Sequence, residues 1–447
     1  MNPRPVHAAA AALLCLLTFP VSALAEARYI LETKLDVDAA PLAARYSFSI
    51  GRTWSDRVHA AYLVTAASPL SSIALAALRA ESGVLEVETD SDVPGVEAHP
   101  SSRAMAAPET LTEQLSLGGT IDYYLSPVRE GYVRQPATRI VGLVDALQRF
   151  GPGSTTVAVI DTGVDPNHPA LRNVLLPGYD FTRDLPGTAN ELADLDQSTV
   201  AILDQSTVAI LDSKQTPVRL NQSTVAILDQ STVAILDGGT FPKAFGHGTM
   251  VAGLVHLIAP QARILPLKAF RADGSASLSD IARAIYFAAD NGATVISMSF
   301  SMNAPSAELK LAIAYATGKG VICVASAGND GSDRAVYPSA FPKVIGVGST
   351  NYADRRSGFS NFGGSVRTSA PGEAVVTTYP GNNYAGVWGT SFSTAQVAGA
   401  VALMQQVRPQ AGFDGVKDAL DHGQRVSQDM GDARLSLAAS IYYCLVY

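Results

Sequence analysis

Cysteine is scarce in this chain of 447 residues, which contains three. One of them, Cys15, lies in the apolar N-terminal segment, so that Cys323 and Cys444 remain in the rest of the chain. At most one disulfide can form between them, and two buried thiols are an equally good interpretation. The low cysteine content excludes a small scaffold that is held together by disulfides.

Charged residues are also few, at 16%, and the 40 acidic and 32 basic side chains include no long basic run. Proteins that bind nucleic acids usually carry a basic patch, so this class is disfavoured. After the N-terminal segment, no apolar stretch reaches the roughly 18 residues that a membrane-spanning helix needs. Apolar residues make up 47% of the chain, which is enough for a folded protein with a large core and an accessory domain.

The N-terminus has the three parts of a secretory signal peptide. Arg4 supplies positive charge, residues 8–17 form a short apolar segment, and Ala-Leu-Ala at 23–25 fits the small-x-small cleavage pattern. We therefore expect residues 1–25 to be a signal peptide. The mature protein is then secreted, into a periplasm or outside the cell, without a membrane anchor.

Residues 26–90 form a first predicted domain. Three strand patterns, near residues 29–33, 58–66 and 84–89, alternate with helical patterns near 41–46 and 70–78. This order predicts a small α+β unit with a ferredoxin-like arrangement. Turn-rich sequence follows, and we interpret residues 91–150 as a linker and N-terminal extension.

The pattern changes from about Thr155. Short apolar runs, typical of strands that are buried on both faces of a parallel sheet, alternate there with helical segments. The runs lie at 156–160, 264–267, 294–298, 321–326 and 344–347. We expect residues 151–447 to form one α/β domain with an open, mostly parallel sheet flanked by helices. Reactive groups in such domains gather at the carboxyl ends of the strands.

A repeat interrupts this domain. The octamer Gln-Ser-Thr-Val-Ala-Ile-Leu-Asp occurs four times without change between residues 197 and 237. Its Thr-Val-Ala-Ile-Leu core favours strands, for which two short hairpins are a plausible arrangement, and it resembles the segment that ends at Asp161. Duplication of that segment explains the repeat without giving it a role. The repeated aspartates either bind calcium or end strands, and we favour the second interpretation.

Three short motifs carry the chemistry, in the order Asp, His, Ser. Asp161 ends an apolar strand and begins Asp-Thr-Gly, which puts a carboxylate in a tight turn at the sheet edge. His247 lies in Gly-His-Gly-Thr at the start of an apolar helix, and Ser391 lies in Gly-Thr-Ser-Phe-Ser-Thr-Ala before another. Each motif alone has an ordinary explanation as a turn or a helix cap. Together and in this order they match what acyl transfer to a serine requires.

The expected roles follow from this chemistry. Ser391 is the nucleophile, His247 the general base and then the general acid, and Asp161 the group that orients the imidazole. Asn329, in Ala-Gly-Asn-Asp after another apolar strand, is expected to complete an oxyanion hole with the backbone N–H of Ser391. A residue at a helix start has a backbone N–H without an intrahelical partner, and the helix dipole favours negative charge there.

These motifs, their order and the strand–helix succession from about 155 to 441 resemble the subtilisin (S8) family of serine proteases, over about two-thirds of the chain. The resemblance implies a subtilisin-like fold and a secreted endopeptidase, made as a zymogen, that acts as a monomer on proteins or peptides. It also implies that residues 26–90 are an inhibitory propeptide, a partner supplied by the chain itself. It implies no cofactor for catalysis. No residue cluster has zinc-site spacing, so no metal site is predicted, and structural calcium has no support in the sequence.

The resemblance extends to substrate-binding positions. Ser299, Phe300 and Ser301 correspond to an extended rim that pairs with the substrate backbone as an added strand. Gly328 and Val336 correspond to further substrate contacts, with Val336 near the specificity pocket. Ser301 and Val336 are bulkier than the residues usual there, which implies small or medium side chains at P1, the substrate residue before the cleaved bond.

The chain departs from the family elsewhere. Ala395 and Gln396 stand where the family has proline and often histidine, which alters the helix start more than the chemistry. Met250 runs directly into a helix, so that a calcium loop found in some relatives is missing. Two further histidines are expected to be structural: His168 shapes the loop after the catalytic aspartate, and His256 lies in the core or at the surface.

Two rival functions use the same residue types. An α/β-hydrolase such as a lipase would have its serine first in the chain, within Gly-x-Ser-x-Gly, but Ser391 comes last and Ser393 replaces the second glycine. That rival fails. The other is an inactive protease fold that acts as an interaction or adhesion module through the insertion at 197–237. The complete set of catalytic residues argues against it.

Overall fold

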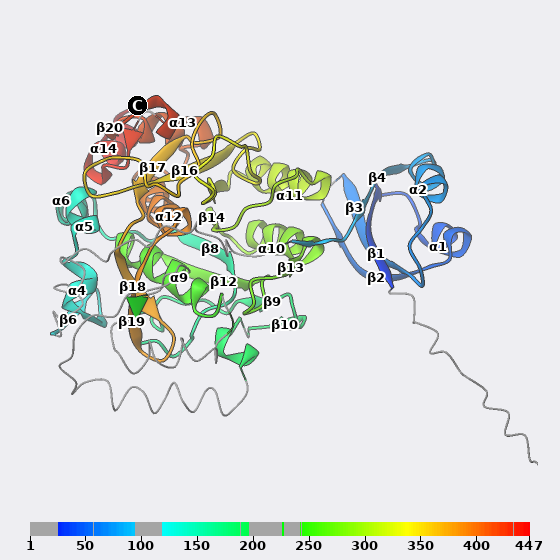
Figure 1. Ribbon diagram of the computed structural model, residues 1–447, viewed down its shortest axis with the longest axis horizontal. Coiled ribbons are helices and arrows are strands. Elements are labelled where there is room, and N and C mark those ends of the chain that lie inside the picture. Colours follow the sequence, from blue (N-terminus) through cyan, green and yellow to red (C-terminus); the bar gives the residue numbers. More distant parts are fainter. Residues whose placement is uncertain are drawn as a thin grey trace, which may run out of the picture.

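The structure of the protein is a computed structural model (Figure 1), which describes residues 26–56, 58–93, 119–187, 189–195, 226–227, 242, 244–431 and 433–447. The expected signal peptide, most of the turn-rich linker and nearly all of the repeat lie outside these residues. Figure 1 shows a small body of strands and two helices, in blue, beside a much larger body that holds the rest of the described chain.

The small body is a four-stranded antiparallel sheet with two helices, in the sheet order β2-β3-β1-β4. Its elements are β1 (Ala27–Lys34), α1 (Ala40–Tyr46), β2 (Phe48–Ser55), β3 (His59–Ala66), α2 (Ser72–Arg79) and β4 (Val84–Thr89). Their order is that of a ferredoxin-like unit. Sequence patterns did not reveal β2, a mostly exposed edge strand in which Arg52 interrupts the alternation of apolar residues.

The large body is built on a ten-stranded sheet of order β10-β9-β12-β8-β14-β15-β16-β17-β21-β20. The strands are β8 (Thr156–Asp161), β9 (Tyr179–Asp180), β10 (Leu185–Pro186), β12 (Arg263–Lys268), β14 (Val295–Met298), β15 (Ile322–Ser326), β16 (Val344–Thr350), β17 (Thr368–Pro371), β20 (Gln424–Arg425) and β21 (Ala433–Arg434). All pairs are parallel except the two at the ends of the sheet. The predicted α/β class with a mostly parallel sheet is confirmed.

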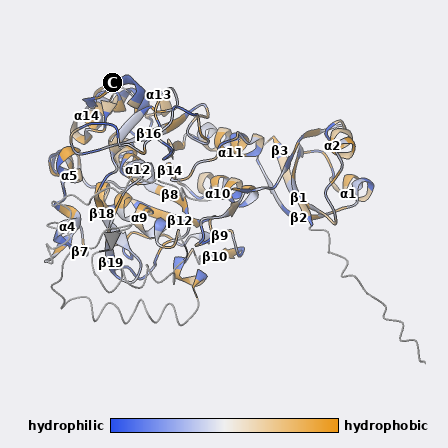
Figure 2. Ribbon diagram, in the orientation of Figure 1, coloured by the Kyte–Doolittle hydropathy of each residue, from blue (hydrophilic) through white to orange (hydrophobic). Residues whose placement is uncertain are grey.

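Helices cover both faces of this sheet and bury its central strands, which explains their continuous apolar runs. The helices are α9 (His247–Ile258), α12 (Thr390–Val407), α13 (Phe413–Leu420) and α14 (Leu437–Val446) with one core, and α10 (Leu278–Asp290) and α11 (Ala307–Gly318) with the other. The short η2 (Gln428–Met430) precedes β21. Figure 2 shows hydrophobic residues along α9 and the neighbouring strands in the middle of the body.

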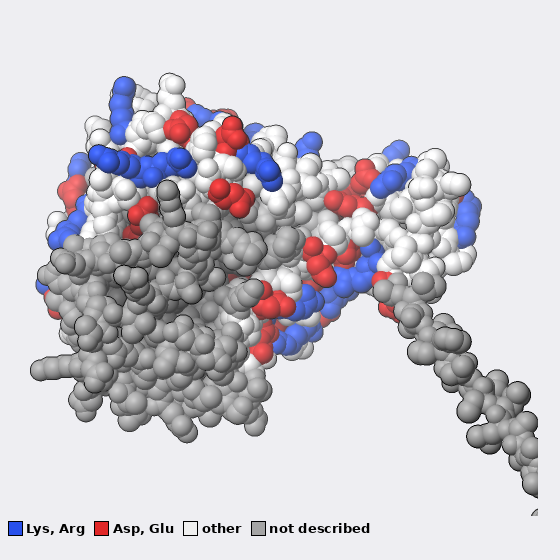
Figure 3. All heavy atoms as spheres, viewed as in Figure 1, with Lys and Arg blue, Asp and Glu red and all other residues white. Residues whose placement is uncertain are grey.

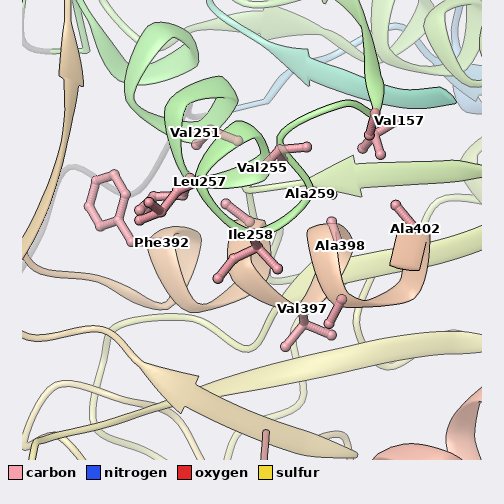
Figure 4. Packing of buried hydrophobic residues seen from close by; sticks show 14 of the residues in the cluster. Val157, Val251, Val255, Leu257, Ile258, Ala259, Phe392, Val397, Ala398 and Ala402 are labelled. Atoms are coloured by element: carbon pink, nitrogen blue, oxygen red, sulfur yellow. The ribbon is translucent and has the colours of Figure 1, made fainter. Parts of the chain in front are cut away.

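The helices α9 and α12 pack closely against each other. Figure 4 shows Val255 and Ile258 of α9 packed against Ala398 of α12. A Cβ added to Gly399 would lie 2.7 Å from the Cβ of Ile258, so a larger residue would push the helices apart.

Residues 119–150 belong to the large body. They form β6 (Thr120–Tyr123), β7 (Ser126–Arg129), α4 (Glu130–Val133), α5 (Pro136–Ile140) and α6 (Leu143–Phe150). Tyr132 is fully buried and its hydroxyl donates to the carbonyl of Gly253 at 2.5 Å. The side chain of Gln135 bonds both the N–H and the C=O of Val376. The boundary that we drew at residue 151 is therefore not a boundary of packing, because the same core includes side chains from this segment.

A second, three-stranded sheet consists of β18 (Val375–Tyr379), β19 (Asn383–Val387) and β11 (Ala226–Ile227), which pairs antiparallel with β19. The strand β11 lies in the third copy of the octamer. One copy of the repeat thus extends a sheet edge, in agreement with the strand propensity of its sequence. The hairpins suggested within the repeat lie outside the described residues.

The small body contacts the N-terminal ends of α10 and α11. Oε2 of Glu88 accepts the N–H of Glu308 at 3.2 Å and the hydroxyl of Ser306 at 2.9 Å. Oδ1 of Asp90 accepts the N–H of Ser279 at 2.9 Å. Helix starts favour carboxylates because their backbone donors and their dipole are positive. Two acidic residues of the small body therefore cap the N-termini of two helices of the large body.

The chain then continues as β5 (Asp92–Val93), which pairs antiparallel with β13 (Ala276–Ser277) of the large body. On the face drawn in Figure 3, acidic and basic side chains are interspersed where the two bodies meet. Among the described residues, no helix combines the length and hydropathy that crossing a membrane requires.

Candidate active site

The strand β8 carries Asp161 to the carboxyl edge of the sheet. The strand lies between β12 and β14, and Asp161 is its last residue. Its carboxylate is buried, and Oδ1 accepts the N–H of Thr162 at 2.8 Å. The φ of Gly163 is 103°, which favours glycine and lets the chain turn sharply. The local sequence thus leaves a buried acid at the sheet edge where open α/β sheets bind ligands.

The helix α9 begins at His247 and presents the imidazole to Asp161. Nδ1 lies 2.8 Å from Oδ1 and 2.9 Å from Oδ2, so Nδ1 carries the donated proton and Nε2 is the second ring nitrogen. Neighbouring glycines permit this approach: Gly246 has a φ of 91°, and a Cβ on Gly248 would lie 1.9 Å from the carbonyl oxygen of Gly163. The Gly-His-Gly motif is thus a requirement of packing.

Ser391, the expected nucleophile, lies at the start of α12, close to the end of β14. The hydroxyl of Ser391 donates to the carbonyl of Ser299 at 3.2 Å, and the hydroxyl of Ser299 donates to the carbonyl of Ser391 at 3.1 Å. The ring of the next residue, Phe392, lies 5.6 Å from the imidazole of His247, centroid to centroid. The structure therefore brings the three motifs to one edge of the sheet.

The amide of Asn329 lies beside the start of α12. Its Oδ1 accepts the N–H of Thr390 at 2.9 Å, and only an oxygen can accept this proton, so the orientation of the amide is fixed. Nδ2 is left as the donor and lies 3.6 Å from the place of a Cβ on Gly389. The N–H of Ser391 is in the first helical turn, where backbone donors have no intrahelical acceptor. Two donors thus lie near the serine.

The residues expected in the substrate rim follow β14 directly. Ser299 makes the hydrogen bonds described above, and Ser301 is half-buried. Phe300 is buried against Phe270, with ring centroids 5.0 Å apart, so its side chain is part of the core. A substrate could meet Phe300 only through its backbone, as pairing with an added strand requires.

Gly328 and Val336, the two further expected substrate contacts, are neighbours. Gly328 has a φ of 98°, and a Cβ on it would lie 3.4 Å from Cγ2 of Val336. The side chain of Val336 is 1% exposed. It therefore fills space beside the glycine that precedes Asn329.

The two further histidines are structural. A ring nitrogen of His168, Nε2, lies 3.0 Å from the carbonyl oxygen of Asn383, which joins the loop after Asp161 to β19. Burial lowers the pKa of His256 to about 4, and its ring meets that of Tyr123 edge-on with centroids 5.9 Å apart. His256 is thus a neutral core residue.

Both cysteines of the folded region, Cys323 and Cys444, are buried free thiols. The sequence left open a disulfide or two buried thiols, and the structure contains two buried thiols. Burial raises the pKa of Cys323 to about 12, so this thiol stays protonated. Within the part of the chain that the structure describes, no three His, Cys, Asp or Glu side chains are grouped to hold a metal ion.

One buried acid near the site, Glu191, was not singled out from the sequence. It begins the short helix η1 (Glu191–Asp194) and accepts the N–H of Gly246 at 2.7 Å. No motif marks it, because it lies in an irregular loop shortly before the repeat. Its complete burial is the only distinguishing feature, and burial at that position depends on residues far away in the chain.

The fold and the site define an α/β protein with an Asp–His pair and a helix-start serine at the carboxyl edge of its sheet. Comparison with known families agrees, since the model of the subtilase family matches residues 153–435. The chain belongs to this family, and the resemblance inferred from its motifs is confirmed.

Individual relatives are proteases of bacteria. The chain is 35% identical over 264 residues to a thermophilic serine proteinase of Bacillus sp. (strain AK1), covering 57% of this chain and 53% of that protein. It is 39% identical over 173 residues to subtilisin BL of Lederbergia lenta, covering 37% and 64%. It is 31% identical over 258 residues to thermitase of Thermoactinomyces vulgaris, covering 56% and 74%. The alignments thus span between about half and two-thirds of the first two relatives.

Proposed function

We propose that this protein is a serine endopeptidase, which hydrolyses peptide bonds through an acyl-enzyme intermediate on Ser391. The observation that carries the proposal is the pairing of His247 with Asp161 at the sheet edge where α12 begins with that serine. Membership of the subtilase family supports the same activity. We expect residues 1–25 to direct export, so secretion of the enzyme is part of this proposal.

The first half of the reaction forms the acyl-enzyme. Nε2 of His247 accepts the proton of the Ser391 hydroxyl while Oγ attacks the carbonyl carbon of the scissile bond. Asp161 holds the Nδ1–H and stabilises the positive charge of the imidazolium. The C–N bond then breaks, and the imidazolium gives its proton to the leaving amine. In the second half, water repeats these steps on the ester and regenerates the free hydroxyl.

Negative charge that develops on the substrate oxygen needs fixed donors. In our proposal these are Nδ2 of Asn329 and the N–H of Ser391, and the positive end of the α12 dipole adds to them. The bond from Thr390 to Oδ1 supports this role, because it holds the amide in one orientation before the substrate binds. No cofactor takes part in this mechanism.

Substrate recognition follows from the rim and the pocket. We assign Ser299, Phe300 and Ser301 to backbone pairing with an extended substrate, and Gly328 and Val336 to the wall of the P1 pocket. The buried side chain of Val336 beside Gly328 supports small or medium P1 residues, because its isopropyl group fills volume that a large side chain would need.

Residues 26–90 act in this proposal as a propeptide that is removed by the enzyme itself. The contacts of Glu88 and Asp90 with the starts of α11 and α10 support a role in folding the large body. After its removal, the enzyme acts as a monomer. A precursor with Ser391→Ala, expressed alone, should stay uncut. Normal processing of that variant would refute self-cleavage, and mass spectrometry of the wild-type product would locate the maturation site.

A labelling experiment tests the activity directly. Purified mature protein is incubated with a fluorophosphonate and, separately, with casein, and the Ser391→Ala variant serves as the control. We expect a covalent label on Ser391, loss of the label in the variant, and casein hydrolysis by the wild type only. A folded, matured wild type that takes no label and cleaves no casein would instead favour a binding module built on an inactive protease fold.

A further inference from the structure

Glu191 is a carboxylate with no solvent exposure, and it lies close to the catalytic pair. It accepts four hydrogen bonds. Oε1 accepts the hydroxyl of Thr162 and, at 2.7 Å, the N–H of Gly246. Oε2 accepts the hydroxyl of Thr249 at 2.6 Å and its N–H at 3.3 Å. Every partner is a donor, so all four bonds can form only when the carboxyl group is ionised.

These bonds reach the residues that adjoin the catalytic pair. Thr162 follows Asp161 in the chain, and its N–H donates to the carboxylate of Asp161. Gly246 precedes His247, and Thr249 lies two residues after it. The hydroxyl oxygen of Thr162 also accepts the N–H of Gly248 at 2.9 Å. A single carboxylate therefore ties the turn after β8 to the first turn of α9.

The surroundings of Glu191 hold charges of both signs. Burial raises the pKa of this carboxyl to about 7, the negative Asp161 adds to the rise, and the hydroxyls of Thr162 and Thr249 and the positive Lys268 oppose it. Lys268 is itself buried and donates to Asp194 at 2.7 Å. Burial and the charge of Glu191 also raise the pKa of the Tyr379 phenol. Glu191 is thus ionised above about pH 7 and protonated below it.

The geometry points to Glu191 as a positioning residue of the active site, which holds the imidazole of His247 in register with Asp161 through Thr162, Gly246 and Thr249. This inference rests on the proposed peptidase function. The carboxylate does not touch the substrate and exchanges no proton with it. It keeps two chain segments, 86 residues apart at the catalytic pair, in one relative position.

The substitution Glu191→Gln preserves the shape and removes this match. The amide oxygen can still accept two of the four bonds, but the NH2 group then faces two donors. The start of α9 shifts away from the turn after β8, and the imidazole loses its alignment. We expect kcat to fall by about 10- to 100-fold, as misplacement of a catalytic group by a fraction of an ångström to 1 Å does, while KM changes little.

The pH profile of kcat separates positioning from simple loss of stability. In the wild type, activity needs both His247 and Glu191 deprotonated. On the acid side of the profile, kcat should therefore fall more steeply with pH than the binding of a single proton allows. In Glu191→Gln the second ionisation is gone, and the fall of kcat towards acid pH should match the binding of one proton. Variant precursors that fail to process are matured in trans by wild-type enzyme, which is removed by an affinity tag before the assay.

Two further variants complete the test. Thr162→Val removes the linking hydroxyl, and the double variant with Glu191→Gln should lose less than the product of the two single losses, because both variants break the bond between Thr162 and Glu191. Asp354→Asn is the control. It weakens an ion pair with Arg434, in which Nε and Oδ1 are 2.8 Å apart, and should lower the unfolding temperature without changing kcat.

The outcomes are distinct. If the wild type takes no fluorophosphonate label, the proposed function fails and the positioning role fails with it. If the wild type is active and folded Glu191→Gln matches it in kcat and in the slope of the acid limb, the positioning role alone is refuted. A kcat that falls only in proportion to the folded fraction, measured by circular dichroism, refutes it as well.

Discussion

A buried pair of carboxyl groups lies where the small body meets the large one, and we expect the association of the two bodies to depend on pH because of it. Glu32 of β1 is 2% exposed and Glu308 of α11 is fully buried. The indole N–H of Trp54 donates to one oxygen of Glu308 at 2.9 Å. Among the described residues, neither Oε1 of Glu32 nor Oε2 of Glu308 meets a donor. Burial and the adjoining Glu308 raise the pKa of Glu32, and burial raises the pKa of Glu308, so we expect the pair to hold a proton while the two bodies are associated.

The magnitude follows from the pKa of Glu32, which burial and the neighbouring Glu308 raise from 4.5 to about 10. Burial raises the pKa of Glu308 too. The other titratable groups around the pair are Glu86, Glu88, Asp56, His59 and Tyr286. A raised acid pKa favours association fully below pH 4.5, and the advantage is lost as the pH rises towards 10. The association constant should fall by up to about tenfold per pH unit, hence by up to about 100-fold between pH 6 and 8.

The assay uses the intact chain. Precursor is folded at low pH and shifted to buffers between pH 5.5 and 9, and the delay between self-cleavage and the appearance of peptidase activity is recorded. The delay should shorten as the pH rises. In Glu32→Gln, whose amide can donate to Glu308 at every pH, it should be long and nearly independent of pH. The control Glu81→Gln changes a carboxylate of the small body that pairs with Arg45 instead, and it should retain the wild-type dependence. An unchanged pH dependence in Glu32→Gln would refute the reasoning.

Three further changes test other parts of the structure. Asn329→Ala should lower kcat by about 10²–10³, the loss measured for an oxyanion asparagine in a subtilisin, with little change in KM; an equal effect on KM would argue against this role. Val336→Gly should raise kcat/KM for phenylalanine relative to alanine at P1 by about tenfold or more in a peptide series, and an unchanged ratio would remove Val336 from the pocket. Tyr132→Phe should lower the free energy of unfolding by about 1 kcal/mol in urea titration, by loss of the bond to Gly253, if residues 119–150 are part of the cooperative unit.

Strands with continuous apolar runs were predicted well from the sequence. The runs that became β8, β14, β15 and β16 are buried on both faces, and such burial leaves a continuous apolar segment. The edge strand β2 and the short elements between residues 119 and 140 were missed. They are too short or too exposed for a local pattern, and the role of Gln135 depends on Val376, which is far away in the chain.

The motifs around the expected catalytic residues could be recognised in the sequence for a physical reason. A Cβ on Gly248 would collide with the carbonyl of Gly163, and Gly246 needs a positive φ, so the close approach of α9 to β8 leaves a mark in the local sequence. The orientation of Asn329 leaves no such mark, because the contact with Thr390 joins two motifs that are 61 residues apart. The buried side chain of Phe300 likewise became apparent only through its packing on Phe270.

Local sequence specifies strands, helices and glycine-dependent turns, because periodicity and backbone sterics act between near neighbours. It was therefore sufficient for the family, the α/β class and the order of Asp161, His247 and Ser391. The buried acids Glu191 and Glu32 acquire their properties only in the folded chain. Desolvation and interactions between charges depend on distance in space, and the partners of these carboxyls are brought to them by folding.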